Sequence, residues 1–90
     1  MHFRIKPHIK PHILRKIIDR HSIEAYEIYE VLEGRFIFTR VDKERYKVIG
    51  KSYGGRFLTM FLDKKRDSFE LVTARESEDS GKRFYKRKTE

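Results

Sequence analysis

Residues 57–62 read FLTMFL, a run that is apolar at nearly every position. A strand of this kind has both faces covered, so the run predicts a strand in the interior of a sheet. Other segments rich in β-branched and aromatic residues lie at 36–41, 46–49 and 69–74. The links at 42–45, 53–55 and 64–68 are short and polar or glycine-rich. Four strands joined by short links predict an antiparallel meander.

Helical patterns flank these strands. Pro11 suits a first helical position, and apolar residues then recur with helical spacing as far as Ile18. Ser22 is expected to cap a second helix that ends at Gly34, and Ser77 a last helix that carries Tyr85. The predicted fold class is α+β, with two N-terminal helices, a four-stranded antiparallel sheet and a C-terminal helix. We expect the helices to pack on one face of the sheet.

A length of 90 residues predicts a single domain over 1–90. The tetrapeptide IKPH occurs at 5–8 and again at 9–12, and prolines four residues apart exclude a regular helix there. We therefore expect an extended arm over 1–10 and an α+β core over 11–87. The repeat leaves three roles open: pairing with a partner, capping an oligomer edge, or disorder.

Basic residues predominate, and the formal net charge is +8. Residues 35–90 hold sixteen of the 22 Lys and Arg but nine of the 14 Asp and Glu. A basic surface attracts phosphates, anionic lipid or an acidic protein tail. The chain has no long apolar run, no secretory signal at its start and no cysteine. We expect a cytoplasmic protein that does not associate with membranes.

Asn, Gln, Cys and Trp are absent, a composition typical of proteins from hyperthermophiles. Because Asn and Gln are the usual bidentate readers of adenine, contacts to nucleic acid would rest on Arg, Lys, hydroxyls and aromatic rings. Four glutamates, at 24, 27, 30 and 33, follow one side of the second helix and predict an acidic stripe. RNA is therefore expected to engage the sheet or the C-terminal region, away from that helix.

The usual catalytic motifs are missing. His8 and His12 lie four residues apart, but Pro11 prevents the helix that would make them a metal pair. The segment around Gly54 and Gly55 lacks the lysine and the following helix of a P-loop. No Gly-x-Ser-x-Gly motif is present. We expect neither a metal site nor a cofactor.

A loose set of residues with chemical potential remains: His21, Lys51, Arg56, Arg75 and Tyr85. Taken singly, each has an ordinary structural role. The histidine after an apolar helix can pack or cap, the arginines can be charges at strand ends, and the tyrosine can be a core residue with a solvated hydroxyl. Only their arrangement in the fold can give them a joint function.

Four motifs in order resemble the BrnT family of toxins. They are RHSI at 20–23 followed by EIYE at 27–30, RYKVIG at 45–50, GRFL at 55–58, and VTAR at 72–75 with the downstream Tyr85. The resemblance covers residues 12–87. The chain departs from the family pattern at Ser22, which stands where a glycine is frequent, and at Gly81, which stands where a glutamate is usual. The family's aromatic–aspartate opening is replaced by the IKPH repeat.

The resemblance implies a RelE-like fold and a metal-independent endoribonuclease acting on RNA. It also implies a small ribbon-helix-helix antitoxin as partner. The implied catalytic candidates are His21, Arg56, Arg75 and Tyr85. The RNA-binding candidates are the basic residues of the second strand and the last helix: Arg45, Lys47, Lys51, Lys82 and Arg83.

The chemistry of RNA cleavage suggests how these groups would act. Arg56 and Arg75 are expected to clamp the scissile phosphate while His21 moves a proton. Tyr85 is expected to donate a proton, stack on a base or pack. The alternative is a non-catalytic module of the same fold that binds RNA or an antitoxin. These alternatives differ in whether bound RNA is cut.

Overall fold

The structure is a computed structural model that describes residues 5–89. The elements follow the predicted order, and the α+β class is confirmed. Among residues 5–89, no helix combines the length and the apolar character that crossing a bilayer requires. The elements are α1 (Pro11–His21), α2 (Ala25–Glu33), β1 (Phe36–Arg40), β2 (Arg45–Lys51), β3 (Phe57–Lys64), β4 (Phe69–Glu76) and α3 (Asp79–Thr89).

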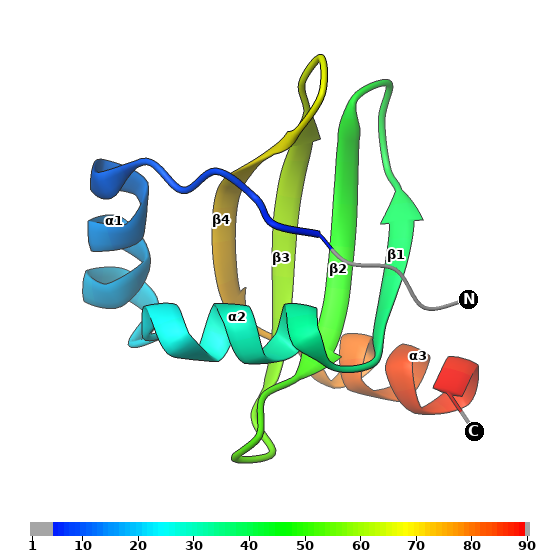
Figure 1. The fold of residues 1–90 in the computed structure, drawn as a ribbon. Helices are drawn as coiled ribbons and strands as arrows, with labels where there is room; N and C mark the ends of the chain where they lie inside the picture. The colour runs from blue at the N-terminus through cyan, green and yellow to red at the C-terminus, as the bar shows by residue number, and fades with distance from the viewer. Residues whose placement is uncertain (1–4, 90) are drawn as a thin grey trace.

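The four strands form an antiparallel meander in the order β1-β2-β3-β4 (Figure 1). Val48 pairs with Met60, and Met60 pairs with Ala74, so these three side chains share one face of the sheet. Because successive side chains of a strand alternate between faces, their neighbours in sequence lie on the other face. A β-bulge shifts the register of β3 and β4 between Phe61 and Leu62.

The first face, called the inner face here, carries the core. The arm and both N-terminal helices lie over it (Figure 1). Ile17 of α1 and Ile28 of α2 are fully buried against Met60 and the other core side chains. α2 packs closely on the sheet at Gly50, since a Cβ built there would lie 2.7 Å from Cγ1 of Val31. A larger residue at this position requires Val31 or the helix to shift.

The other face, called the outer face here, is partly covered by α3. A Cβ at Gly81 would lie 3.7 Å from Oγ1 of Thr59 and 3.8 Å from Cδ1 of Ile49. Both partners alternate with core residues of their strands, so α3 packs on the opposite side of the sheet from α1 and α2. The prediction that all helices share one face is therefore wrong. Tyr85 holds this helix in place by packing edge-on against Phe57 at a centroid distance of 5.5 Å.

The N-terminal arm docks on its own sheet. The N–H of His8 donates to the carbonyl of Phe69 at 2.8 Å, and the N–H of Leu71 donates back to the carbonyl of His8 at 2.9 Å. Ile5 is buried in the core, and Lys10 pairs with Glu70. The described part of the arm is thus an extended segment that covers the start of edge strand β4. Residues 1–4 of the predicted arm lie outside the described residues.

Two of the expected helix caps are different in the structure. Ser22 adopts a left-handed conformation (φ 52°, ψ 39°) and ends α1, with its N–H donating to the carbonyl of Ile18. The N-cap of α2 is Glu24, whose N–H donates to Oε1 of Glu27 in a capping box. Ser77 lies two residues before α3, where it is buried and its hydroxyl pairs with that of Thr59 at 2.8 Å.

Candidate functional site

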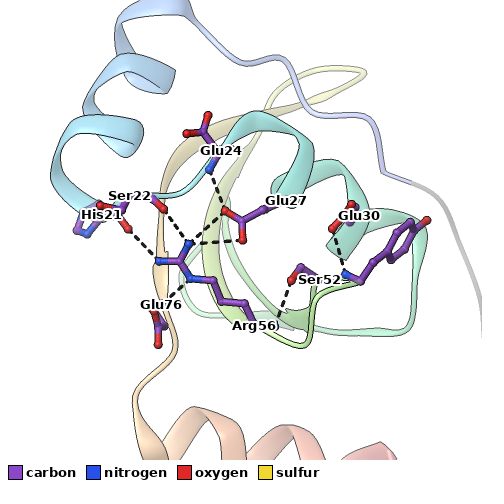
Figure 2. A network of polar contacts seen from close by, with 9 residues as sticks. His21, Ser22, Glu24, Glu27, Glu30, Ser52, Arg56 and Glu76 are labelled. Atoms are coloured by element: carbon purple, nitrogen blue, oxygen red, sulfur yellow. Dashed lines mark hydrogen bonds and ion pairs between the residues drawn. The ribbon is translucent and has the colours of Figure 1, made fainter.

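Arg56 lies on the inner side of the sheet, beneath the junction of α1 and α2 (Figure 2). Its Nη1 donates to the carbonyl of Ser22 at 2.7 Å, and its Nη2 donates to the carbonyl of His21 at 3.2 Å. Nη1 also lies 3.2 Å from Oε1 of Glu27, and Nε lies 3.1 Å from Oε1 of Glu76. The guanidinium is therefore surrounded by acceptors that belong to the protein itself.

The carboxylate that faces Arg56 is largely buried. The side chain of Glu27 is 12% exposed and that of Arg56 is 28% exposed. A carboxylate at this depth needs a cation and hydrogen-bond donors to offset the loss of hydration. Glu27 receives these from Arg56 and from the N–H of Glu24. Arg56 acts as a structural clamp that joins both N-terminal helices to β3 and β4.

The same geometry changes the expected acidic stripe on α2. Glu27 points into the fold, while Glu30 accepts from the N–H of Tyr53 at 3.0 Å and Glu33 accepts from the Tyr53 hydroxyl at 3.3 Å. These two carboxylates hold the β2–β3 turn and raise the pKa of the Tyr53 hydroxyl, chiefly through the charge of Glu33. The predicted acidic stripe is interrupted at Glu27, because this carboxylate is largely buried against Arg56, the residue just before β3.

Arg75 lies on the outer face. It pairs with Thr59 across β3 and β4, and Thr59 alternates with the core residues Leu58 and Met60. The sheet therefore separates the guanidinium of Arg75 from that of Arg56. The expected clamp of Arg56 and Arg75 on one phosphate is not formed, because the two strands present these residues to opposite faces.

His21 is the last residue of α1 and does not line the outer-face hollow that contains Arg75. Its carbonyl accepts from Arg56, and its side chain lines a groove between α1 and β4 together with Lys16 and Arg20. Nothing in this geometry brings the imidazole to the hollow that Arg75 lines. His21 is thus separated from the arginine with which it was expected to act.

A small hollow of about 90 Å³ is present on the outer face (called the outer-face site here). Lys47 of β2 and Arg75 of β4 line it from either side of β3, and Phe61 and Thr59 lie between them. The first turn of α3 closes one end of the hollow. The residues that line it are Lys47, Ile49, Thr59, Phe61, Arg75, Glu78, Ser80 and Gly81.

The electrostatics of the outer-face site favour an anion. Arg75 is about half exposed, and its ion-pair partner is the exposed carboxylate of Glu78, at 3.7 Å. An exposed pair at this distance is weak, so the guanidinium can exchange that partner for a phosphate. The N–H groups at the start of α3 add partial positive charge at the same end. The sequence analysis missed Phe61, Thr59, Glu78 and Ser80. Phe61 pairs with Lys47 and Thr59 pairs with Arg75, and only the register of the sheet reveals these pairs.

The other predicted RNA-binding residues extend the basic surface. Arg45 and Lys51 share the outer face of β2 with Lys47, because they are separated from it by even numbers of residues. Arg45 forms a two-point pair with Asp63 at 2.7 and 3.0 Å, and this hydrogen bonding holds the pKa of Asp63 below its usual value and raises that of Arg45. Lys51 lies over the ring of Phe57, with Nζ 5.6 Å from the centroid.

The last helix contributes further cations. Lys82 and Arg83 lie in its first half, and its last turn carries Lys86, Arg87 and Lys88. Lys86 faces the ring of Phe57 from the side of α3, with Nζ 5.8 Å from the centroid. Basic groups of β2 and α3 therefore meet around one aromatic ring at the end of the outer face.

Tyr85 has a packing role. Its hydroxyl donates to the carbonyl of Arg35 at 2.9 Å, and its ring packs on Phe57. The tyrosine joins α3 to the start of β1, and the residues lining the outer-face site do not include it.

Within residues 5–89, no three His, Asp or Glu side chains are grouped closely enough to hold a metal ion. Comparison with protein-family models, with curated proteins and with solved structures finds no match to the chain. The residues themselves therefore carry the functional argument.

Proposed function

We propose that this protein is the toxin of a toxin–antitoxin pair, and that it binds and cleaves single-stranded RNA at the outer-face site. The observation that carries the proposal is the placement of Lys47 and Arg75 in one hollow, on the face of the sheet that α1 and α2 leave open. The resemblance to BrnT-type toxins supports the same class of substrate. His21 and Arg56 have no part in the proposed site.

The shape and charge of the outer face suit single-stranded RNA. Phe61 offers an aromatic ring between the two cations, and base–aromatic stacking contributes about 1–3 kcal/mol per base. The chain holds no Asn or Gln, so phosphate contacts and stacking dominate over base reading. We expect binding that depends strongly on salt and weakly on sequence.

The proposed reaction is a metal-independent transesterification. The 2′-oxygen attacks the adjacent phosphorus, the bond from phosphorus to the 5′-oxygen breaks, and the products are a 2′,3′-cyclic phosphate and a 5′-hydroxyl. Arg75 and Lys47 stabilise the charge that develops on the phosphoryl oxygens. Glu78 accepts the proton of the 2′-hydroxyl, and the ammonium of Lys47 gives a proton to the departing 5′-oxygen.

A second candidate function is RNA binding without cleavage. The contact between Arg75 and Glu78 favours it, because a carboxylate that keeps this contact is less available as a base. The two candidates share the site and differ in the fate of the bound RNA. A cleavage assay separates them.

The test uses purified protein and a short unstructured RNA, with and without a chelator. We expect cleavage that the chelator leaves unchanged, and a rate reduced at least about 100-fold by Glu78→Gln with RNA affinity retained. Glu44→Gln, an exposed acid in the β1–β2 turn, is the matched control and should cut at the wild-type rate. Salt-dependent binding with RNA left intact from about pH 5 to pH 9 would select the binding module. Equal rates for wild type and Arg75→Gln would remove that arginine from the mechanism.

The antitoxin belongs to the same proposal. The resemblance implies a small ribbon-helix-helix protein that neutralises the toxin. Co-expression with the product of a small neighbouring gene should relieve growth inhibition caused by this chain. Inhibition that persists with every such neighbour, or no inhibition at all, would argue against the toxin assignment.

A further inference from the structure

A second hollow lies between α1 and the edge strand β4. This groove has a volume of about 330 Å³. Ile13 and Ile17 of α1 and Val72 of β4 provide its apolar lining, and Ile17 is fully buried beneath it. The apolar part of the lining is aliphatic, and no Phe or Tyr belongs to it among the described residues. Such a surface suits an aliphatic side chain.

The polar residues of the groove are nearly all basic. Lys16, Arg20 and His21 line it, all three from α1, and no acidic residue lines it among residues 5–89. Lys16 and Arg20 are exposed, and neither forms an ion pair with another residue of the described range 5–89. The hydroxyl-bearing Thr73 completes the lining from β4. The groove thus combines an aliphatic interior with basic side chains from one helix.

We propose that the α1–β4 groove binds a partner protein through a segment in which acidic residues flank an aliphatic side chain. Charge complementarity selects acidic residues in that segment, because the groove offers cations and no carboxylate. The aliphatic lining selects a Leu-, Ile- or Val-like side chain and disfavours RNA, which has no such group. This site is separate from the outer-face site, so the proposal stands whether or not the outer face acts on RNA.

The test measures binding of a synthetic peptide in which glutamate and leucine alternate, with both ends blocked. Two further peptides of equal length separate charge from apolar contact: one pairs glutamate with serine and the other pairs lysine with leucine. We expect the glutamate–leucine peptide to bind most tightly. Its amide chemical-shift changes should be confined to α1 and to β4 around Val72 and Thr73.

Charge reversal in the groove supplies the decisive variant. Lys16→Glu/Arg20→Glu should weaken binding of the glutamate–leucine peptide at least about tenfold. Lys6→Glu/Arg15→Glu makes the same change in net charge at exposed residues that do not line the groove, and should bind within about twofold of wild type. If circular dichroism shows that charge reversal unfolds the chain, Lys16→Gln/Arg20→Gln replaces it.

Equal peptide affinity for the groove variant and the control variant would overturn the proposal. The same holds if no peptide binds, if the glutamate–serine peptide binds as well as the glutamate–leucine peptide, or if shift changes fall on the outer face. A short RNA that competes with the peptide and shifts α1 would show that the groove is a nucleic-acid site, which also contradicts the proposal. The peptide experiment tests the α1–β4 groove and the RNA cleavage assay tests the outer-face site. Either proposal can therefore fail while the other holds.

Discussion

Nη1 of Arg56 lies 3.2 Å from Oε1 of Glu27, and this contact joins the start of β3 to the first turn of α2 beneath the α1–α2 junction. The guanidinium of Arg56 does not reach the outer face, because the sheet lies between it and Arg75. The structure therefore assigns one arginine to stability and leaves the other for an anion.

Replacing Arg56 should destabilise the fold and leave RNA binding unchanged. Arg56→Ala leaves Glu27 largely buried without a cation and removes donors to the carbonyls of His21 and Ser22. We expect the free energy of unfolding to fall by about 2–4 kcal/mol, measured by urea denaturation. Adding Glu27→Gln removes the unpaired buried charge at nearly constant volume. The double variant Glu27→Gln/Arg56→Ala should therefore be more stable than Arg56→Ala alone. A native-like stability of Arg56→Ala combined with lost RNA affinity would contradict this assignment.

Glycine at position 22 should stabilise the protein. Ser22 ends α1 with a positive φ of 52°, a conformation that costs a residue with a Cβ about 1 kcal/mol. Its hydroxyl forms no hydrogen bond within the described part of the chain and the residue is exposed, so Ser22→Gly removes no side-chain hydrogen bond. We expect a gain of about 0.5 kcal/mol in the free energy of unfolding, reduced from the full value by the greater freedom of glycine in the unfolded chain. A lower stability of the variant would show that the left-handed conformation carries no cost here.

Gly50 should tolerate no side chain. In Gly50→Ala the new Cβ would meet Cγ1 of Val31 at 2.7 Å and Cβ of Phe36 at 3.1 Å, so the buried Val31 side chain or α2 itself must shift. We expect a loss of about 1–3 kcal/mol, measured by thermal or urea unfolding. The double variant Val31→Ala/Gly50→Ala removes the closest clash and should lose less than the two single losses combined. If the two single losses simply add in the double variant, the contact with Val31 is not the cause of the destabilisation by Gly50→Ala.

The ion pair of Arg45 and Asp63 gives a pH dependence of known sign. Hydrogen bonding to Arg45 lowers the pKa of Asp63, so the folded state binds its proton less readily than the unfolded chain. The pair therefore stabilises the fold above the usual aspartate pKa of about 3.9, and this contribution is lost as the pH falls through the lower value of the folded state. NMR titration of the Asp63 carboxyl should show its pKa rising in Arg45→Gln. An unchanged titration would show that the pair does not persist in solution.

The fold was predictable where local pattern decides it. Alternating and continuous apolar runs indicated the four strands, and Pro11 indicated the start of α1. The face on which α3 lies was not predictable, because it depends on Ile49 and Thr59 pointing away from the core, and that requires the register of the whole sheet. Ser22 shows the same limit on a smaller scale, since serine fits both an N-cap and, at some cost, a left-handed C-cap.

The site was harder to predict for a related reason. Whether Arg56 and Arg75 share a face depends on the pairing of β3 with β4, and the bulge near Phe61 shifts that pairing in a way that no residue in the sequence marks. That Lys47 shares a face with Arg45 and Lys51 was predictable, by contrast, because two-residue alternation within one strand needs no knowledge of a partner strand. Their function as RNA contacts stays a prediction.

The central claim is that Lys47 and Arg75 form the RNA site, and the salt dependence of RNA affinity tests it most directly. The dissociation constant for a short single-stranded RNA is measured over a range of salt concentrations for wild type, Lys47→Gln/Arg75→Gln and the charge-matched control Lys6→Gln/Arg15→Gln. The outer-face variant should bind more weakly, and the slope of log affinity against log salt should become shallower by roughly 1.4, or about 0.7 for each lost phosphate contact. The control should keep the wild-type slope, whereas equal slopes for both double variants would contradict the account.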